Sequence, residues 1–278
     1  MFKKEDFIDG DKFEDIAKNL NIIFTETKNL KHLSSLSYFK NINTKIIMSH
    51  NCDGCILAKG RKINPIPGLS KSRDIDFEWD NIPSTLKFLF AQNADVRDDR
   101  IIPLPIGLER DKWYPELKKK DIIIELSDQV IDKTKLVYLN VNINNNLTVR
   151  PGLYTLFQNN NWCTVEQTIN GDSFKDFALK IKSHKFILCP DGNGMDTHRI
   201  WESLYLGSYP IVQRHYFTEE FSKHVPLLIV DNIRDVNEEL LNRKYEEFKN
   251  RKWNWRYLKI SYWKKLIQEK YDSLKEVI

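Results

Sequence analysis

The segment CPDGNGMDTHRIWESLYLGSYPIV, residues 189–212, gathers charged and polar side chains where an apolar run gives way to a helical pattern. Gly192 and Gly194 favour a tight turn whose backbone N–H groups can approach an anion. Arg199 falls in the first turn of the following helix, where its guanidinium and the positive helix end both attract phosphate. These residue types in this order predict a phosphate or diphosphate site.

Glu202 follows Arg199 by three residues and lies on nearly the same helix face. A carboxylate repels phosphate but accepts hydrogen bonds from ribose hydroxyls, so the pair indicates a nucleotide. The alternative is purely structural: Asp196 caps the helix, and Arg199 and Glu202 form an ordinary ion pair. The segment contains neither the G-x-G-x-x-G dinucleotide motif nor a Walker A loop.

Short apolar runs alternate with helical stretches along the chain, a pattern typical of parallel sheets crossed by helices. The predicted fold class is therefore α/β. The predicted strands are 21–25, 45–50, 86–92, 101–108, 135–143, 162–167, 185–190, 209–213 and 226–231. The predicted helices are one near 30–40, then 151–160, 173–184, 198–207, 217–224 and two amphipathic helices in the tail.

A chain of 278 residues suits two packed lobes. The elements predict an N-terminal lobe over 1–115 and a doubly wound C-terminal lobe over 135–235. A lysine run and weak periodicity indicate a linker over 116–134. The tail, 236–278, is expected to pack as helices against the body.

The net charge is only +4, from 43 basic and 39 acidic residues, and gives no strong sign of nucleic-acid binding. The N-terminus lacks the apolar core of a signal peptide, and no uninterrupted apolar run is long enough to span a membrane. We therefore expect a soluble, cytoplasmic protein. The four cysteines, Cys52, Cys55, Cys163 and Cys189, are interpreted as ordinary thiols, because no zinc spacing or disulfide framework is visible.

Two D-x-D sequences offer carboxylate pairs that could hold a metal ion, Asp9-Gly10-Asp11 and Asp74-Ile75-Asp76. The first lies in a charged leader and the second in a loop. Because neither follows a clear strand, no metal site is predicted at either.

Three stretches carry a resemblance to a known family. HKFILCPDGNGMDTHRIWESLYLGSYPIV resembles the nucleotide-sugar motif of exostosin-like glycosyltransferases of the family 47 type. FAQNADVRDDRIIPLPIGLERDKWY is similar to the segment that closes the N-terminal lobe of bacterial and viral relatives, and LVYLNVNINNNLTVRPGLYTLF resembles the start of their donor lobe. The resemblance covers about residues 84–232.

The resemblance implies a GT-B architecture, in which two Rossmann-like lobes with parallel sheets face a cleft and C-terminal helices pack across it. The donor would bind the C-terminal lobe and the acceptor mainly the N-terminal lobe. Such enzymes transfer sugar with inversion and need no bound metal, since a helix end and basic side chains neutralise the diphosphate. We therefore expect no cofactor and no metal ligands.

The donor-site roles follow from the resemblance. Arg150 and Arg199 would bind the diphosphate, and Glu202 the ribose. Asp196 and His198 would contact sugar hydroxyls or cap the helix. Close backbone approach is expected at the turn, and the asparagine loop would line the same site; these residues are Gly192, Asn193, Gly194, Asn142 and Asn144. For Arg150 a solvated helix start is the alternative.

An inverting transfer also needs a base to deprotonate the acceptor hydroxyl. MSHNCDGC, residues 48–55, ends a predicted strand and offers Asp53 as the first candidate and His50 as the second. An Asx turn explains Asp53 equally well. Asn93, after the strand predicted over 86–92, is a candidate for orienting the acceptor or the donor.

The expected function is transfer of a sugar from a UDP-linked donor, such as UDP-xylose, UDP-galactose or UDP-glucuronic acid, to a glycan or glycoconjugate. The alternative is a non-catalytic nucleotide- or carbohydrate-binding module on a decayed transferase fold. An epimerase or a phosphorylase on the same fold is a third possibility. We expect a monomer or weak homo-oligomer without nucleic-acid partners.

Overall fold

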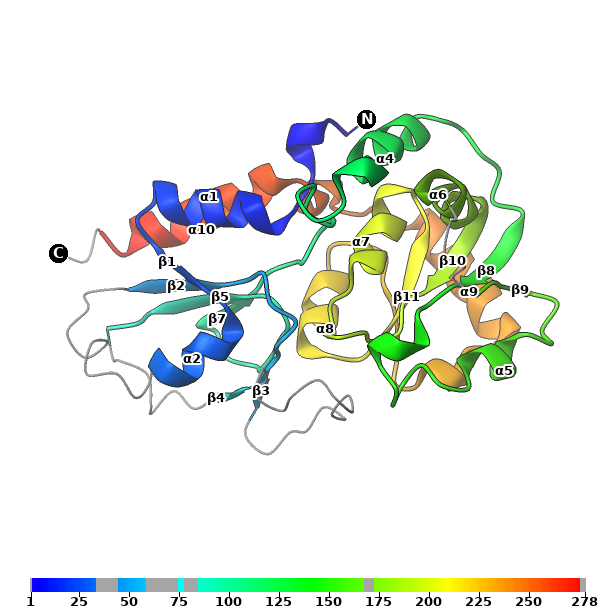
Figure 1. Ribbon diagram of the computed structural model, residues 1–278, viewed down its shortest axis with the longest axis horizontal. Coiled ribbons are helices and arrows are strands. Elements are labelled where there is room, and N and C mark those ends of the chain that lie inside the picture. Colours follow the sequence, from blue (N-terminus) through cyan, green and yellow to red (C-terminus); the bar gives the residue numbers. More distant parts are fainter. Residues whose placement is uncertain (1, 34–44, 59–74, 78–84, 168–172, 276–278) are drawn as a thin grey trace.

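The computed structural model describes residues 2–33, 45–58, 75–77, 85–167 and 173–275. Helices and strands alternate along the chain, and every described strand pairing is parallel. The predicted α/β class with parallel sheets is confirmed, and the arrangement is consistent with a Rossmann-like fold. The two halves of the chain lie side by side, each around its own main sheet (Figure 1).

The main sheet of the N-terminal half has the strand order β1-β2-β5-β7. Its strands are β1 (Ile23–Thr25), β2 (Ile46–Ser49), β5 (Phe88–Ala91) and β7 (Ile101–Pro103). A smaller sheet, β4-β3-β6, joins β4 (Ile75–Phe77), β3 (Ile56–Ala58) and β6 (Ala94–Asp95). The described residues of this half include the helices α1 (Gly10–Asn19) and α2 (Thr27–Leu33). Helix α1 buries Phe13, Ile16 and Ala17, which recur at helical spacing.

The sheet of the C-terminal half has the order β12-β11-β10-β8-β9. Because the chain moves outward from β8 to β9 and then returns to β10 on the other side, the strand order reverses between β8 and β10. Open α/β sheets bind ligands at such a reversal. The strands are β8 (Lys135–Leu139), β9 (Cys163–Val165), β10 (His184–Leu188), β11 (Tyr209–Gln213) and β12 (Leu228–Val230). The helices between them are α5 (Leu153–Phe157), α6 (Phe174–Ser183), α7 (His198–Tyr205) and α8 (Tyr216–Ser222).

The segment predicted as a linker contains a helix, α4 (Lys119–Ser127), after the short turn η3 (Pro115–Leu117). Helix α4 buries Ile123 and Leu126 and packs against α6 and α7. Three consecutive isoleucines, 122–124, obscure the helical period in the sequence. This stretch is therefore part of the C-terminal packing, and it brings the Lys119 side chain beside Glu202 of α7.

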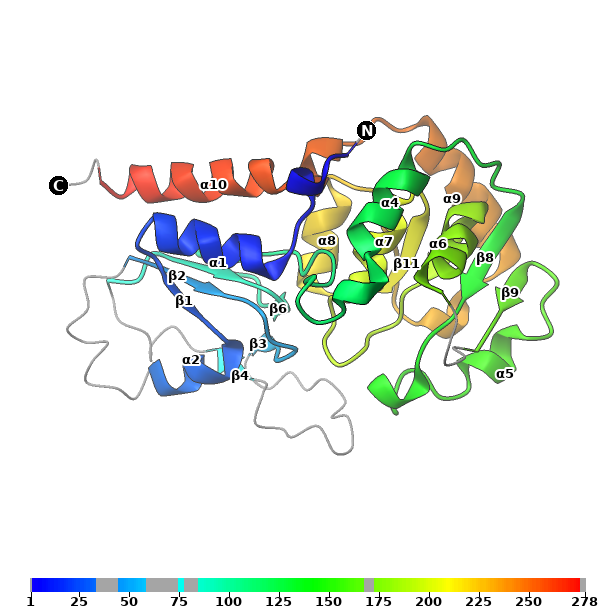
Figure 2. The same ribbon diagram turned by 45° about the horizontal axis from the view of Figure 1, so that its top comes forward.

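The tail contacts both halves. Helix α9 (Glu238–Asn250) packs on the C-terminal half, and the chain then turns through η6 (Trp255–Leu258) into α10 (Ile260–Ser273). Helix α10 lies beside α1 on the N-terminal half in both views (Figures 1 and 2). Trp263 meets Phe13 edge to face, and Lys45 Nζ donates to the carbonyl of Leu274 at 2.7 Å.

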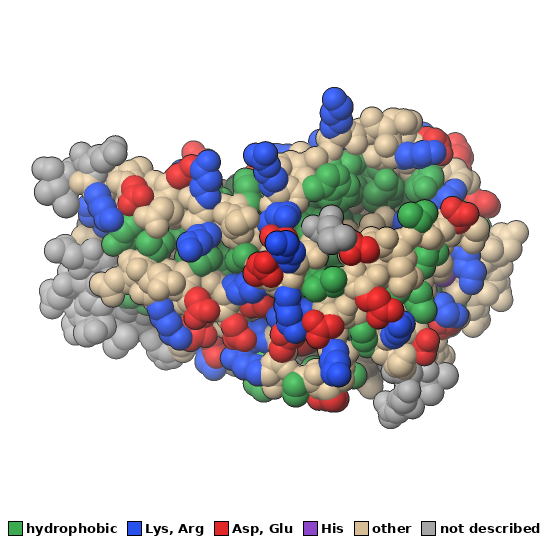
Figure 3. Space-filling model, turned by 90° about the horizontal axis from the view of Figure 1, so that it is seen from above, with side chains coloured by type: hydrophobic (Ala, Val, Ile, Leu, Met, Phe, Trp, Pro, Cys, Tyr) green, Lys and Arg blue, Asp and Glu red, His purple; other side chains and the backbone are tan. Residues whose placement is uncertain are grey.

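Three short turns complete the described elements: η1 (Lys4–Asp6), η4 (Ile143–Asn145) and η5 (Ile233–Asp235). Basic and acidic side chains are interspersed over the face shown in Figure 3. Within the described ranges, no helix combines the length and the apolar character that crossing a bilayer requires.

Candidate functional site

A cavity of about 340 Å³, which we term the first cavity, lies at the carboxyl ends of β8 and β10, beside the first turn of α7. This is the point where the strand order reverses. Three predicted residues, His50, Asn93 and Asn144, do not line it. The predicted residues that do are Asp53, Asn142, Arg150, Gly192, Asn193, Gly194, Asp196, His198, Arg199 and Glu202.

Arg150 is buried at the edge of this cavity, so the solvated helix start that was its alternative is wrong. Its guanidinium donates to three backbone carbonyls: Asp191 at 2.9 Å, Asn142 at 2.8 Å and Pro190 at 3.2 Å. These bonds join the loops after β8 and β10. Burial, together with the charge of Arg199, lowers the pKa of Arg150 to about 10, so the group stays charged at neutral pH. Its described hydrogen-bond acceptors are neutral carbonyls, so they do not neutralise the positive charge of the guanidinium.

Arg199 and Glu202 do form the ion pair of the structural alternative, with Nε 3.3 Å from Oε2. Arg199 Nη1 also donates to the carbonyl of Asn140 at 2.6 Å, and its guanidinium stacks over Phe177 at 4.1 Å. Glu202 is buried, and Lys119 Nζ stands 3.8 Å from its other oxygen. The pair is thus fixed in position, and both residues still line the cavity.

The glycines of the turn are explained by packing. A Cβ at Gly194 would stand 2.6 Å from Asn93 Nδ2 and 3.0 Å from the carbonyl of Asp53. A Cβ at Gly192 would stand 2.8 Å from Arg150 Nη2. Neither glycine is among the described positive-φ residues. Because Gly194 has no side chain, Asn93 and the Asp53 carbonyl of the other half can pack against it. Gly192 in the same way leaves room for the Arg150 guanidinium.

Asp196 does not cap α7, because the N-cap residue is Thr197. The Asp196 carboxylate instead accepts the Ile106 N–H at 2.6 Å and the Trp201 indole N–H at 2.8 Å. Its own N–H donates to Asn93 Oδ1 at 2.8 Å. Burial raises the pKa of Asp196 to about 7, and the two N–H donors oppose that rise. With both oxygens occupied, Asp196 connects the two halves.

His198 begins α7 and faces the boundary between the halves. Its Nδ1 lies 2.8 Å from the carbonyl of Gly107, and since a carbonyl only accepts, Nδ1 carries a proton. Its Nε2 lies 3.6 Å from Glu109 Oε2. The side chain keeps 30% of its surface exposed. Thus its bond goes to the N-terminal half, and it does not cap its own helix.

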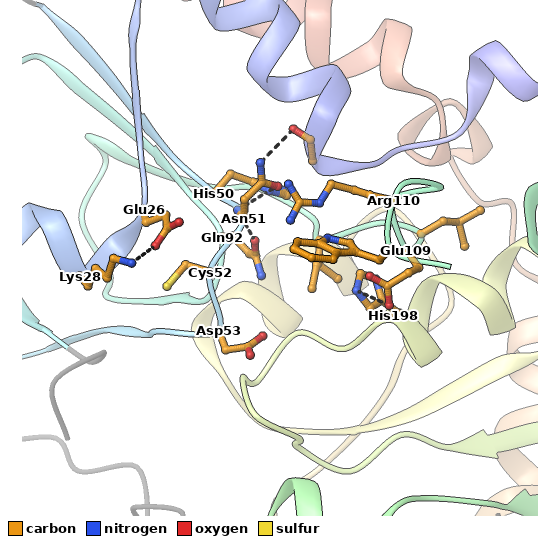
Figure 4. Close-up of a pocket in the computed structure, with 14 residues that line it drawn as sticks. Glu26, Lys28, His50, Asn51, Cys52, Asp53, Gln92, Glu109, Arg110 and His198 are labelled. Atoms are coloured by element: carbon orange, nitrogen blue, oxygen red, sulfur yellow. Dashed lines mark hydrogen bonds and ion pairs between the residues drawn. The ribbon is translucent and has the colours of Figure 1, made fainter. Parts of the chain in front are cut away.

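A second cavity, of about 310 Å³, lies in the N-terminal half at the carboxyl ends of β1, β2 and β5. Figure 4 shows the residues that line it, with Glu109 and His198 together at one end and Asp53 on the loop after β2. Of the residues described in both halves, four line both cavities: Asp53, Ile106, Glu109 and His198. The two cavities therefore adjoin at these side chains.

The two candidate bases have different surroundings. Asp53 is half-buried and lines both cavities. His50 is buried; its Nε2 lies 3.0 Å from the carbonyl of Pro105, and its Nδ1 accepts the Asn51 N–H at 2.8 Å. Burial lowers the pKa of His50 to about 4. Both of its nitrogens are occupied and the ring is neutral, so this geometry gives His50 a structural role in its loop and not the role of a base.

The asparagine loop contributes in a way that differs from the prediction. Asn142 lines the first cavity, but its Oδ1 accepts the Asn144 N–H at 3.0 Å, and Asn145 takes the expected place of Asn144 in the lining. Asn146, which sequence reasoning missed, is buried and donates to the carbonyl of Gly192 at 3.1 Å. A run of three asparagines, 144–146, is the only signal for it in the sequence.

A third cavity, of about 600 Å³, adjoins the first one between α4, α6 and the end of β8. Aromatic side chains of Tyr138, Phe174 and Phe177 line it, together with polar groups such as Asn140 and Glu166. Three residues line both this cavity and the first: Lys119, Arg199 and Glu202. Lys119 was missed because its helix was predicted as a linker.

A buried charged group near the cavities was also missed. His215 Nε2 lies 2.9 Å from Asp191 Oδ2, and its Nδ1 lies 3.7 Å from Asp95 Oδ2 in the N-terminal half. Burial alone would lower the pKa of His215, but Asp191, followed by Asp95, raises it to about 9. The protonated ring therefore joins the loop after β10 to the other half.

Asp9, in the first D-x-D, caps α1 by accepting the Lys12 N–H and also pairs with Lys120 at 2.8 Å. Asp74 of the second lies outside the described residues. Where side chains are described, no group of three or more His, Cys, Asp or Glu residues is arranged to hold a metal ion.

No family model matches the chain, and no curated protein matches it.

Proposed function

We propose that this protein is a glycosyltransferase of GT-B architecture that moves a sugar from a nucleotide-sugar donor to a glycan hydroxyl with inversion. The observation that carries the proposal is a pair of fixed arginines, Arg150 and Arg199, in a cavity at the strand-order reversal. That cavity adjoins a polar cavity of the other half at shared side chains. The remaining support comes from how the three cavities are arranged.

The first cavity suits a diphosphate. Arg150 keeps its charge without a described ion pair, and Arg199 adds a second guanidinium from the first turn of α7. Guanidinium groups bind phosphate oxygens through paired N–H donors, and the positive helix end favours the same charge. As the bond to the sugar breaks, these groups would stabilise the negative charge on the departing diphosphate, which is why we propose no metal requirement.

The third cavity suits the nucleoside of the donor. Phe174 and Phe177 contribute apolar surface for a base, and Asn140 and Glu166 supply polar groups. A ribose connects a base to a diphosphate, so it would lie where the first and third cavities meet. Arg199 and Glu202 stand at that boundary, which supports the proposed contact of Glu202 with ribose hydroxyls.

The second cavity suits a hydroxyl-rich acceptor. Trp113 lines it with 57% of its surface exposed, and such a flat apolar face stacks well on a sugar ring. Gln92 Nε2, also in the lining, has no hydrogen-bond partner within the described structure. A buried amide donor without a partner is costly, so a ligand hydroxyl at this position would be favourable.

The proposal is tested by a thermal-shift screen with UDP, GDP, ADP and CDP, followed by an assay for hydrolysis of the nucleotide sugars whose nucleotide stabilises the protein. We expect one nucleoside diphosphate to raise the melting temperature of the protein. Hydrolysis of the nucleotide sugar built on that diphosphate should then release the same diphosphate. The free nucleoside is the matched control. If none of the diphosphates stabilises the protein, the proposed donor site is wrong.

The alternative, a binding module on a decayed transferase fold, makes a different prediction in the same screen. It predicts stabilisation by a nucleotide or a carbohydrate, with no hydrolysis of any sugar donor and no transfer to a glycan. The presence of titratable side chains at the junction of two cavities favours the enzyme.

A further inference from the structure

The junction of the first and second cavities is where the reacting atoms of a sugar transfer would meet. This inference rests on the proposed function: the donor diphosphate would lie in the first cavity and the acceptor in the second. Among the residues that the structure describes, three titratable side chains line both cavities, namely Asp53, Glu109 and His198. A base that deprotonates the acceptor must be within hydrogen-bond reach of its hydroxyl, so it is expected among these three.

The hydrogen bond at 2.8 Å between His198 Nδ1 and the Gly107 carbonyl fixes both the orientation and the tautomer of the ring. With the proton on Nδ1, the lone pair of the neutral ring is on Nε2. His198 lines both cavities, and its Nε2 lies 3.6 Å from Glu109 Oε2, which is longer than a hydrogen bond. We propose that His198 is the catalytic base, with Nε2 as the atom that takes the proton.

Sugar transfer in this arrangement breaks two bonds and forms two. The acceptor O–H bond breaks and its proton moves to His198 Nε2. The electron pair of the acceptor oxygen forms the new bond to the anomeric carbon. The bond from that carbon to the phosphate oxygen breaks, and its electron pair leaves with the nucleoside diphosphate beside Arg150 and Arg199.

Glu109 is a positioning residue in this proposal. After proton transfer, the imidazolium would donate from Nδ1 to Gly107 and face the Glu109 carboxylate from Nε2. An adjacent carboxylate stabilises an imidazolium as it forms.

Two substitutions separate the base from a structural role. His198→Asn keeps an amide that can donate to Gly107 at the position of Nδ1, but it has no basic nitrogen. His198→Gln places a non-basic amide near Nε2 and loses the Gly107 bond. If His198 only holds the Gly107 loop, then the Asn variant keeps its activity and only the Gln variant loses it.

The assay is donor hydrolysis by the full chain, with the sugar donor found for the wild type, and nucleoside diphosphate stabilisation is measured in parallel. We expect both variants to keep that stabilisation and to lose kcat by about 10²- to 10⁴-fold. Imidazole added to His198→Ala should restore part of the rate. Asp53→Asn tests the competing candidate base in parallel. Arg214→Ala, at an exposed arginine that lines none of the three cavities, is the control and should retain the activity.

Retained kcat in His198→Asn would overturn the proposal, as would a loss confined to Asp53→Asn. Absence of imidazole rescue in a variant that still binds the diphosphate would also contradict it. If the wild type binds a diphosphate but hydrolyses no donor, the binding-module alternative holds and His198 is not a base. If the wild type binds no diphosphate, the proposed function itself is wrong.

Discussion

Gly194, in the loop after β10, packs directly against Asn93, at the end of β5 in the other half of the chain. The Asn93 amide donates toward the carbonyls of Cys52 and Asp53, at 3.3 and 3.4 Å, and its oxygen accepts the Asp196 N–H. One side chain therefore holds the loop after β2 against the loop after β10. These two loops carry residues of both adjoining cavities, so their spacing sets the geometry of the junction.

Gly194→Ala tests this contact. The added methyl group would stand 2.6 Å from Asn93 Nδ2 and 3.0 Å from the backbone carbonyl of Asp53, two groups that are themselves hydrogen-bonded to each other. We expect a loss of stability of about 1–3 kcal/mol, the usual effect of overpacking, together with a lower affinity for the donor. Denaturant unfolding measures the first and a binding titration the second. Gln158→Ala, at an exposed position that lines none of the three cavities, is the control and should change neither; an unchanged Gly194→Ala variant would disprove the contact.

Arg199→Ala should abolish turnover with a modest loss of folding stability. The substitution removes a diphosphate ligand and the bond to Asn140, but Lys119 remains 3.8 Å from Glu202 and limits the cost of leaving that carboxylate buried. Activity and melting temperature are measured together. Arg214→Ala removes an exposed arginine that pairs with Glu219 and Asp231 at the end of β11, and it should leave activity intact. Equal effects of the two substitutions would count against the donor site.

The stability of the protein should fall as the pH rises from about 6.5 to about 9. Asp191 and Asp95 raise the pKa of His215 from 6.5 to about 9 in the folded state, so folding favours the protonated ring. This contribution is fully present below the unfolded pKa and is lost as the pH rises through the folded one. Urea unfolding across this range measures it.

His215→Gln is the control for the pH dependence, because glutamine can still donate to Asp191 but does not titrate. We expect this variant to be less stable than the wild type at pH 6.5 and to approach it at higher pH. Burial raises the pKa of Asp196 from 3.8 to about 7, so its contribution to stability also falls with rising pH, but between about pH 4 and pH 7. Parallel pH profiles for wild type and variant above pH 7 would show that His215 is not the titrating group.

Much of the fold follows from local patterns in the sequence. The strand predicted over 209–213 is β11 with the same bounds, and alternating apolar runs and helices were sufficient to predict parallel sheets. The strand predicted over 101–108 ends at Pro103, because Pro103 and Pro105 lack the N–H that a ladder needs. Helix α4 was missed because its burial depends on α6 and α7, which lie far along the chain.

The lining of the first cavity could be predicted, but the partners of its residues could not. Arg199 and Glu202 lie together because helical spacing requires it, and that is visible in the sequence. Asp196, by contrast, is bonded to Ile106 and Trp201, and His198 to Gly107. Contacts between the halves depend on how the two sheets are placed, which no local pattern specifies.

The most direct test of the central claim, a diphosphate site in the first cavity, is calorimetric titration of the protein with the stabilising nucleoside diphosphate and with its free nucleoside. Because Arg150 and Arg199 are proposed to hold the phosphates, the diphosphate should bind measurably and the nucleoside much more weakly. Arg199→Ala should remove most of that difference. Equal binding of the two ligands, or a difference that survives in Arg199→Ala, would contradict the account.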